Sequence, residues 1–134
     1  MIVADASVIV AALTDAGADG AWASTALGTG DLAAPEILGA EVTNALRRAE
    51  RLGLVDPTTA TLAFRDLCDL PVRHFPFAPF ALRVWDLRAN FSAYDAWYVA
   101  LAEELDCPLA TLDERMARAV AQQTDIDVRN HPAA

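Results

Sequence analysis

The sequence predicts an α/β fold: one domain over residues 1–134, with a mainly parallel central sheet of four or five strands flanked by helices. Two observations lead to this prediction. Short apolar, strand-like segments alternate with longer amphipathic segments of helical period, the pattern of parallel α/β proteins. No repeat, linker or low-complexity tract interrupts the 134 residues, and this length corresponds to one domain with a core of its own.

Five short apolar segments are expected to form strands, because each ends at a turn or at a helix-start residue. In chain order they are residues 1–4, 32–34, 72–75, 109–111 and 126–128. Helices are expected in the segments between and after them, over residues 7–13, 19–27, 36–52, 57–70, 80–87, 92–105 and 115–122.

Cap and breaker residues place the helix boundaries. Gly28-Thr29-Gly30 ends the second helix, and Gly53 is a typical stop signal for the third. Asp56-Pro57 puts an N-cap acid before a proline at the first helical position. Pro71 ends the fourth helix, and Ser92-Ala93-Tyr94-Asp95 resembles a capping box at the start of the sixth. Groups that follow parallel strands gather at the carboxyl edge of the sheet, so chemistry is expected there.

Composition narrows the class of protein. Hydrophobic residues make up 54% and charged residues 22%, which excludes intrinsic disorder. The longest apolar run, residues 6–13, is too short for a membrane span, and the N-terminus lacks the basic region of a signal peptide. Cys68 and Cys107 have no metal or redox spacing and are expected to be reduced. We therefore expect a soluble, cytoplasmic protein with no membrane partner.

The charge balance restricts the partners. Nineteen acidic residues oppose ten arginines, lysine is absent, and the formal net charge is −9. Such a chain is a poor non-specific binder of nucleic acid, because attraction to phosphate supplies most of that affinity. Its acids either attract cations, face a basic partner, or form solvated helix faces, and the last is expected for most of them.

Two aspartates directly follow strand-like runs. Asp5 comes after residues 1–4 and Asp113 after residues 109–112, so both are expected at the carboxyl edge of the sheet. Each is also suited to be an ordinary helix N-cap, a position that aspartate fills well. Their equivalent settings favour a functional role for the pair.

Two further acids face the apolar side of their helices. At 100° per residue, Glu41 lies inside the apolar arc of its helix beside Ala45, and Asp95 lies on the same side as Val99. A carboxylate in such a place is costly unless its charge is compensated. An ion pair with Arg48 would be a purely structural explanation for Glu41, and helix capping would be one for Asp95.

Four acids that point at one crevice repel one another, and the chain has no lysine to neutralise them. A hard divalent cation would do so, because Mg²⁺ and Mn²⁺ prefer oxygen ligands. One or two such ions would activate water and offset charge on a phosphodiester. The sequence therefore predicts a Mg²⁺ site, with Mn²⁺ as the alternative ion, formed by Asp5, Glu41, Asp95 and Asp113.

Four segments in this order resemble the PIN-domain ribonucleases, and more closely their VapC-type toxins. The segments are IVADASV (2–8), EVTNALRR (41–48), SAYDAWYVALAE (92–103) and LATLD (109–113). The resemblance carries the family's acidic site residues onto the four acids named above, and its small hydroxyl positions near the metal onto Ser7 and Thr111. It implies a Mg²⁺- or Mn²⁺-dependent endoribonuclease, a dimeric toxin, and a small VapB-type antitoxin that blocks the site.

Two questions stay open on the sequence alone. A non-catalytic, toxin-like module that holds a basic partner peptide would also be acidic, although binding alone does not require four intact acids. Five arginines near the motifs either contact RNA or serve solubility and helix charge pairing: Arg47, Arg48, Arg51, Arg115 and Arg118.

Overall fold

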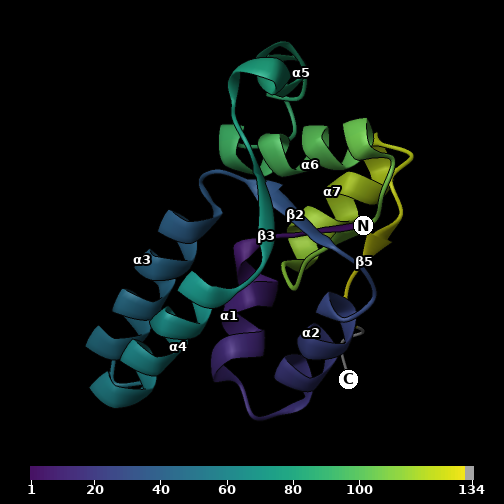
Figure 1. Ribbon diagram of the computed structural model, residues 1–134. Coiled ribbons are helices and arrows are strands. Elements are labelled where there is room, and N and C mark those ends of the chain that lie inside the picture. Colours follow the sequence, from purple (N-terminus) through teal and green to yellow (C-terminus); the bar gives the residue numbers. More distant parts are fainter. Residues whose placement is uncertain (132–134) are drawn as a thin grey trace.

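A five-stranded, all-parallel sheet lies at the centre of the computed structural model, which describes residues 1–131 (Figure 1). The strand order is β3-β2-β1-β4-β5, and every neighbouring pair is parallel. The strands are β1 (Ile2–Ala4), β2 (Leu32–Pro35), β3 (Val72–Phe75), β4 (Leu109–Ala110) and β5 (Val128–Arg129). The predicted parallel α/β architecture is therefore confirmed.

Seven α-helices and one short 3₁₀ helix connect the strands within the described residues. They are α1 (Ala6–Thr14), α2 (Ala18–Leu27), α3 (Leu38–Arg51), α4 (Pro57–Asp69), η1 (Ala78–Phe80), α5 (Ala81–Asp86), α6 (Ala93–Leu105) and α7 (Glu114–Gln123). Parallel crossovers are right-handed, so α1–α4 cover one face of the sheet and α5–α7 the other (Figure 1). None of the helices in residues 1–131 has the length and apolar character that crossing a bilayer requires.

The strands that follow β1 are added first on one side of it and then on the other. It moves outward through β2 to β3, and then comes back to β4 and β5, so β1 pairs with both β2 and β4. The crossovers after β1 and β4 diverge to opposite faces of the sheet. The carboxyl ends of two such strands are the place where open α/β sheets bind their ligands.

The core is built around β1 and α6. Ile2, Val3 and Ala4 are at most 1% exposed, and residues 96–102 of α6 are all buried. A helix that is buried nearly all round its middle must lie between other layers. Here α6 packs against β1, β2 and β4 on one side and against α5 on the other. The charged residues of α6 therefore lie only near its two ends, Asp95 at the start and Glu103 and Glu104 at the end.

Several boundaries differ from the sequence prediction, each for a local reason. The third helix begins at Leu38 and not at residue 36, because the Glu36 N–H donates to Phe75 O at 3.0 Å and extends the β2–β3 ladder. The expected helix over residues 80–87 is shorter, because α5 spans Ala81–Asp86 and Phe80 ends the preceding 3₁₀ helix η1, which contains Pro79. The last strand begins at Val128, because the Ile126 N–H bonds to Thr124 Oγ1 in a turn. Gly53 does end its helix, at φ 72°.

Candidate active site

Asp5 lies at the carboxyl end of β1, directly beside the end of β4. Its N–H donates to Ala110 O at 3.1 Å, which continues the β1–β4 ladder by one residue. The side chain is 7% exposed and caps α1, where Ser7 N and Val8 N donate to its Oδ1. The N-cap interpretation is therefore correct, and the same carboxylate lies at the carboxyl edge of the sheet, where the sequence predicted it.

Two hydroxyl groups hold the Asp5 carboxylate from opposite sides. Ser7 Oγ donates to Oδ1 and Thr111 Oγ1 donates to Oδ2. Each hydroxyl also accepts a backbone N–H, from Leu112 to Ser7 at 2.9 Å and from Asp113 to Thr111 at 3.0 Å. Each hydroxyl directs its proton at Asp5, because an ionised carboxylate oxygen can only accept and the backbone N–H can only donate. The result is a rigid carboxylate joined to the segment that contains Asp113.

Burial dominates the protonation of Asp5. It raises the pKa of the carboxyl group, the hydrogen bonds from Ser7, Thr111 and Val8 act in the opposite direction, and the charge of Asp95 raises the pKa further. The net pKa is above its usual value. Without a cation, the native structure therefore holds this group at an electrostatic cost.

Glu41 reaches the crevice from α3, on the other side of the site from β4. Its Oε1 accepts a hydrogen bond of 2.7 Å from the Tyr98 hydroxyl. Burial raises the pKa of Glu41, and the charges of Asp5 and Asp95 raise it further, against the lowering effect of Tyr98. Within residues 1–131 this carboxylate makes no ion pair, so the structural explanation through Arg48 is not realised.

Asp95 enters the site from the first turn of α6. Ser92 caps this helix by accepting the Asp95 N–H at 3.1 Å, as the sequence predicted, and the Asp95 side chain is half-buried. Burial raises its pKa, and the charge of Asp113 raises it further, whereas Ser92 and the Arg115 guanidinium lower it. Asp95 thus lies within electrostatic reach of three other acids, since it also raises the pKa of Asp5 and Glu41.

Asp113 is the most solvent-exposed of the four acids. It is the N-cap of α7, and its Oδ1 accepts from Arg115 N at 3.0 Å and from Met116 N at 3.2 Å. The capping interpretation is therefore correct for this residue. Its charge nevertheless acts on Asp95, which places it at the rim of the same cluster.

The donor set fits a divalent cation in its chemistry. The cluster offers hard carboxylate oxygens, and burial together with the charges of neighbouring acids raises the pKa of Asp5, Glu41 and Asp95. In residues 1–131 no cationic side chain forms an ion pair with any of the four acids. Across this part of the chain, no three His, Cys, Asp or Glu side chains converge closely enough to enclose an ion directly. Mg²⁺ keeps several of its waters and needs only one or two direct carboxylates, so an open arrangement suits it.

Comparison with protein families bears on what this cluster is for. The model of the PIN domain matches residues 2–122, which include all four acids. The chain belongs to the PIN-domain family. The Asp5 carboxylate after β1 and the acids on α3 and α6 thus all lie within the PIN domain.

Known relatives place this PIN-domain protein among the VapC proteins. Ribonuclease VapC9 of Mycobacterium tuberculosis is 39% identical over 131 residues, covering 96% of this chain and 98% of VapC9. The crystal structure of a Pyrobaculum aerophilum protein has a TM-score of 0.71 at 21% identity, covering 96% of this chain and 82% of that one. VapBC2 from Rickettsia felis, solved with a DNA fragment from its promoter, has a TM-score of 0.67 at 13% identity, covering 98% and 100%.

Two residues of the site were missed from the sequence. Tyr98 donates to Glu41, and Asn130 Nδ2 donates to Thr111 O at 2.8 Å. Tyr98 follows Asp95 by three residues and so lies on the same side of the helix, which was a usable signal. No sequence signal pointed to Asn130, because its position beside Thr111 depends on the pairing of β4 with β5.

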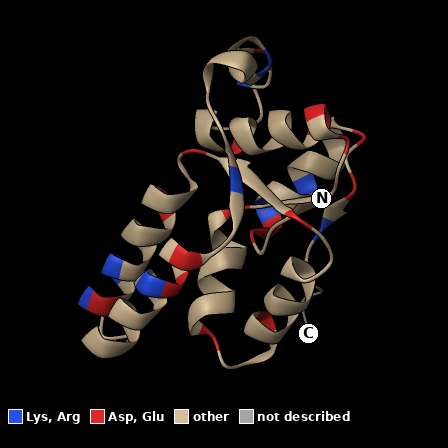
Figure 2. Cartoon of the chain, viewed as in Figure 1, with Lys and Arg blue, Asp and Glu red and all other residues tan. Residues whose placement is uncertain are grey.

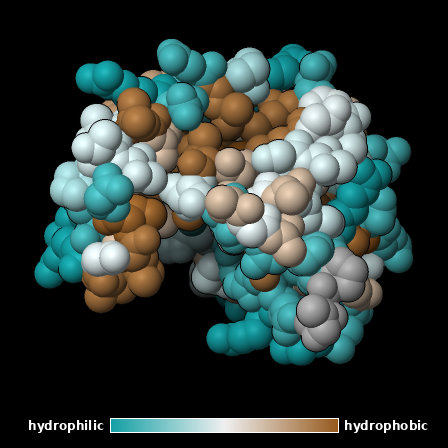
Figure 3. Space-filling model, turned by 90° about the horizontal axis from the view of Figure 1, so that it is seen from below, coloured by the Kyte–Doolittle hydropathy of each residue, from teal (hydrophilic) through white to brown (hydrophobic). Residues whose placement is uncertain are grey.

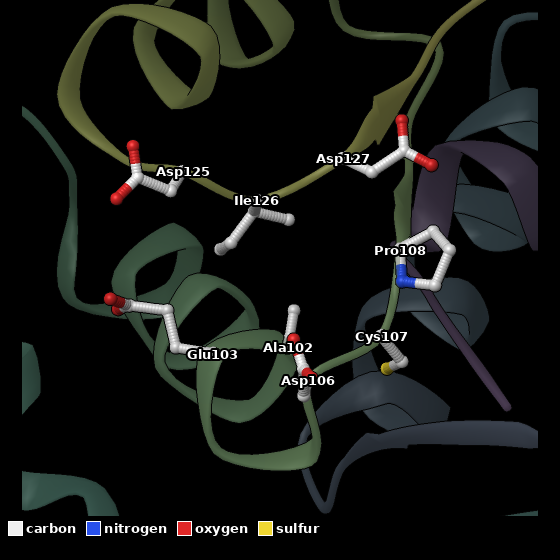
Figure 4. A pocket seen from close by; sticks show the side chains of 8 residues that line it. All are labelled: Ala102, Glu103, Asp106, Cys107, Pro108, Asp125, Ile126 and Asp127. Atoms are coloured by element: carbon white, nitrogen blue, oxygen red, sulfur yellow. The ribbon is translucent and has the colours of Figure 1, made fainter.

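A second acidic region lies at the opposite, amino edge of the sheet. A cavity of about 460 Å³ is lined there by residues that precede β4 and β5, including Cys107 and Pro108 (Figure 4). The carboxylates of Asp125 and Asp127 point away from each other in this view. Such divergence does not create a cation site, and the cavity is separate from the predicted cluster.

Proposed function

We propose that this PIN-domain protein is the toxin of a VapBC-type pair, an endoribonuclease that hydrolyses RNA phosphodiesters with Mg²⁺ or Mn²⁺ in the cytoplasm. The observation that carries the proposal is the set of carboxylates with raised pKa values at the switch point of the sheet. Perturbed acids grouped in a crevice are typical of catalytic sites. Divalent-metal dependence is general in this family, which matches the donor chemistry.

Each acid has a distinct part in this function. Asp5, Glu41 and Asp95 would hold the cation, and Asp113 would contribute at the rim, through its charge or through a metal-bound water. When bound, the cation supplies an activated water and offsets charge on the scissile phosphate. Ser7 and Thr111 keep the Asp5 carboxylate fixed and oppose the effect of burial on its pKa, because a hydroxyl that donates to a carboxylate favours its charged form.

Arg115 is the arginine best placed to meet the substrate. Its charge lowers the pKa of Asp95, so the guanidinium lies within electrostatic reach of the cluster. The arginines of α3, by contrast, lie toward the C-terminal part of that helix, away from the sheet (Figure 2). An RNA strand could thus contact the cation and Arg115 together, although the protein as a whole repels it.

Cleavage of a structured RNA with added Mg²⁺, Mn²⁺ or EDTA tests the proposal. We expect cleavage with either ion and none in EDTA, and calorimetric titration should show Mn²⁺ binding to the wild type but not to Asp5→Asn. Asp66→Asn is the matched control, because Asp66 is an exposed acid on α4 outside the cluster. A wild type that binds no divalent ion and cuts no RNA would instead support the non-catalytic binding module.

We propose further that a VapB-type antitoxin places an arginine of its inhibitory segment among these carboxylates. Charge-assisted hydrogen bonds from a guanidinium to two carboxylates would replace the cation. A groove of about 390 Å³ between α1 and α3 leads to the site: its lining includes Ser7, and Val10, Ala11 and Ala45 supply apolar surface. Viewed from below, hydrophobic residues also gather on the α3–α4 side of a hollow (Figure 3).

The antitoxin proposal predicts competition with the cation. Antitoxin affinity should fall as Mg²⁺ rises and as salt rises, and Glu41→Gln should weaken it and reduce its Mg²⁺ dependence. The measurement is binding of the antitoxin to wild type and to Glu41→Gln across a Mg²⁺ series. If the antitoxin affinity changes neither with Glu41→Gln nor with the Mg²⁺ concentration, the antitoxin acts only by covering apolar surface.

We also propose that the toxin is a homodimer that uses the exposed hydrophobic face of α5. Leu82 is 84% exposed and Trp85 64% exposed, which is unusual for such side chains on a monomer. Leu82→Glu should convert a dimer to a monomer in sedimentation experiments. Leu54→Glu, at a leucine that is 74% exposed beyond the end of α3, should leave the dimer intact.

A further inference from the structure

The Tyr98 hydroxyl is buried in the protein core and has one partner. Tyr98 is 1% exposed and belongs to the buried stretch of α6. Its hydroxyl donates to Glu41 Oε1 at 2.7 Å, across 57 positions of sequence. A buried hydroxyl without a partner is costly, so this bond satisfies Tyr98. It also fixes one of the two oxygens of Glu41.

The bond joins two helices that pack on different parts of the protein. Glu41 is on α3, which packs against α1 and α4, whereas Tyr98 is on α6, which packs against the sheet and α5. Asp95 lies one turn before Tyr98 on the same helix. The position of Glu41 relative to Asp95 is therefore set by the packing of two separate layers, with α3 on one face of the sheet and α6 on the other (Figure 1). The hydrogen bond from Tyr98 to Glu41 ties the two layers together.

The geometry leaves the other oxygen of Glu41 available. Oε2 receives no hydrogen bond from the side chains and backbone described in residues 1–131. A donor on Oε1 restricts rotation of the carboxylate, so Oε2 keeps a fixed direction. Groups that orient metal ligands in this way typically change metal affinity by about 10–100-fold when they are removed.

We propose that Tyr98 is a positioning residue that holds Glu41 in register with Asp95 and thereby sets the affinity of the site for its divalent cation. The inference rests on the proposed function, because it requires that Glu41 binds the cation. The hydroxyl itself contacts neither the cation nor the RNA and acts through the Glu41 carboxylate. A merely structural tyrosine would affect stability and leave cation affinity unchanged.

Calorimetric titration of the whole protein with Mn²⁺ separates these two roles. Tyr98→Phe removes only the hydroxyl and should weaken Mn²⁺ binding by about tenfold or more. Tyr94→Phe is the matched control, because it removes the same atom from the same helix at a side chain that is 58% exposed. Tyr94→Phe should bind Mn²⁺ as the wild type does.

A double-mutant cycle shows whether Tyr98 acts through Glu41. Glu41→Gln should weaken Mn²⁺ binding on its own, and adding Tyr98→Phe to it should cost much less than Tyr98→Phe costs in the wild type. RNA cleavage by Tyr98→Phe should recover when Mn²⁺ is raised. If wild type and Tyr98→Phe both bind Mn²⁺ with equal affinity, the inference about Tyr98 is wrong and the proposed function is unaffected. A wild type that binds no Mn²⁺ would overturn the proposed function as well.

A second measurement does not depend on the folding of Tyr98→Phe. The sequence contains two tyrosines, so Tyr98 is the only one left in Tyr94→Phe. In that variant, labelled with ¹³C at the tyrosine Cζ, Mg²⁺ should shift the single Tyr98 resonance. The shift should disappear in Tyr94→Phe with Glu41→Gln. If the Tyr98 chemical shift does not change at Mg²⁺ concentrations that saturate the site, the inference is wrong.

Discussion

Asp5 and Asp95 are held by different environments, although both are acids of one cluster. Asp5 accepts hydrogen bonds at both carboxylate oxygens, from Ser7, Val8 and Thr111. Asp95 is half-buried, and within residues 1–131 no cationic group forms an ion pair with it. The loss of charge should therefore have a different effect on stability at each position.

Replacing either acid by its amide should reduce RNA cleavage by at least about 100-fold, the upper end of what loss of a ligand-orienting group costs. In EDTA, Asp95→Asn should raise the Tm, because it removes a desolvated charge that Asp113 repels. Asp5→Asn should raise it less or leave it unchanged, since an amide has one oxygen to accept bonds from two hydroxyls. Thermal unfolding measures both. A lower Tm for Asp95→Asn would identify Asp95 as structural.

The sequence indicated the acids of the proposed site, and the family resemblance added Ser7 and Thr111, but Tyr98 and Asn130 were missed. Glu41 and Asp95 are detectable because a charge on an apolar helix face is anomalous. Tyr98 gives a weaker signal: its spacing from Asp95 puts it on the same side of the helix, but a phenol on such a face resembles any other core residue. The exposure of Asp113 was also beyond reach, since it depends on how α7 leaves the sheet.

At the scale of elements, caps were predictable and strand order was not. The acid of Asp56 and the hydroxyl of Ser92 accept backbone N–H groups as expected. Strands of two to four residues contain too few side chains to specify their neighbours, so the sheet could be predicted as parallel but not as β3-β2-β1-β4-β5. The right-handed crossovers then decide only which face of the sheet each connecting helix covers.

The capping bond of α7 allows the two roles of Asp113 to be separated. Asp113→Ala should lose about 1 kcal/mol of stability with its cap, whereas Asp113→Asn keeps an acceptor oxygen and should be nearly as stable as wild type. Both variants lose the charge and should lose RNA cleavage to a similar extent, by about tenfold. Urea unfolding and cleavage rates measure the two effects. If Asp113→Asn cleaves RNA as fast as wild type, Asp113 acts only as the N-cap of α7 and has no part in the site.

The close approach of α1 and α2 depends on Gly20. A Cβ at this position would lie 1.8 Å from Asp15 O, at the end of α1. Gly20→Ala should therefore separate the two helices and cost about 1–3 kcal/mol in urea unfolding. Gly39→Ala is the control: a Cβ there meets nothing within 4 Å, so this variant should be up to about 1 kcal/mol more stable. If Gly20→Ala and Gly39→Ala have equal free energies of unfolding, α1 and α2 do not pack closely at Gly20.

At the scale of the whole molecule, the raised pKa values of Asp5, Glu41 and Asp95 make stability depend on pH. An acid with a raised native pKa binds its proton more tightly in the folded chain than in the unfolded one. Its stabilising contribution is therefore complete at pH values below its unfolded pKa and is lost as pH rises through its native pKa.

We expect the metal-free protein to be more stable at pH 5 than at pH 8, which is the reverse of ordinary acid denaturation. Mg²⁺ should reduce or reverse the difference, because it binds the ionised carboxylates of the folded chain. Urea midpoints at both pH values, in EDTA and in Mg²⁺, test this. Combining Glu41→Gln with Asp95→Asn should flatten the dependence in EDTA. A wild type that is more stable at pH 8 in EDTA would show that these acids are compensated.

The hydrogen bond between Thr111 and Asp5 spans 106 positions of sequence, and β1 lies between β2 and β4. During translation, Asp5 emerges from the ribosome long before its partner strand exists. Its carboxylate is then without the Thr111 donor, and Asp113 has not yet been made. A nascent chain therefore lacks the full set of four acids until residues 109–113 have been made and β4 has joined the sheet, so the proposed site is completed only late in synthesis.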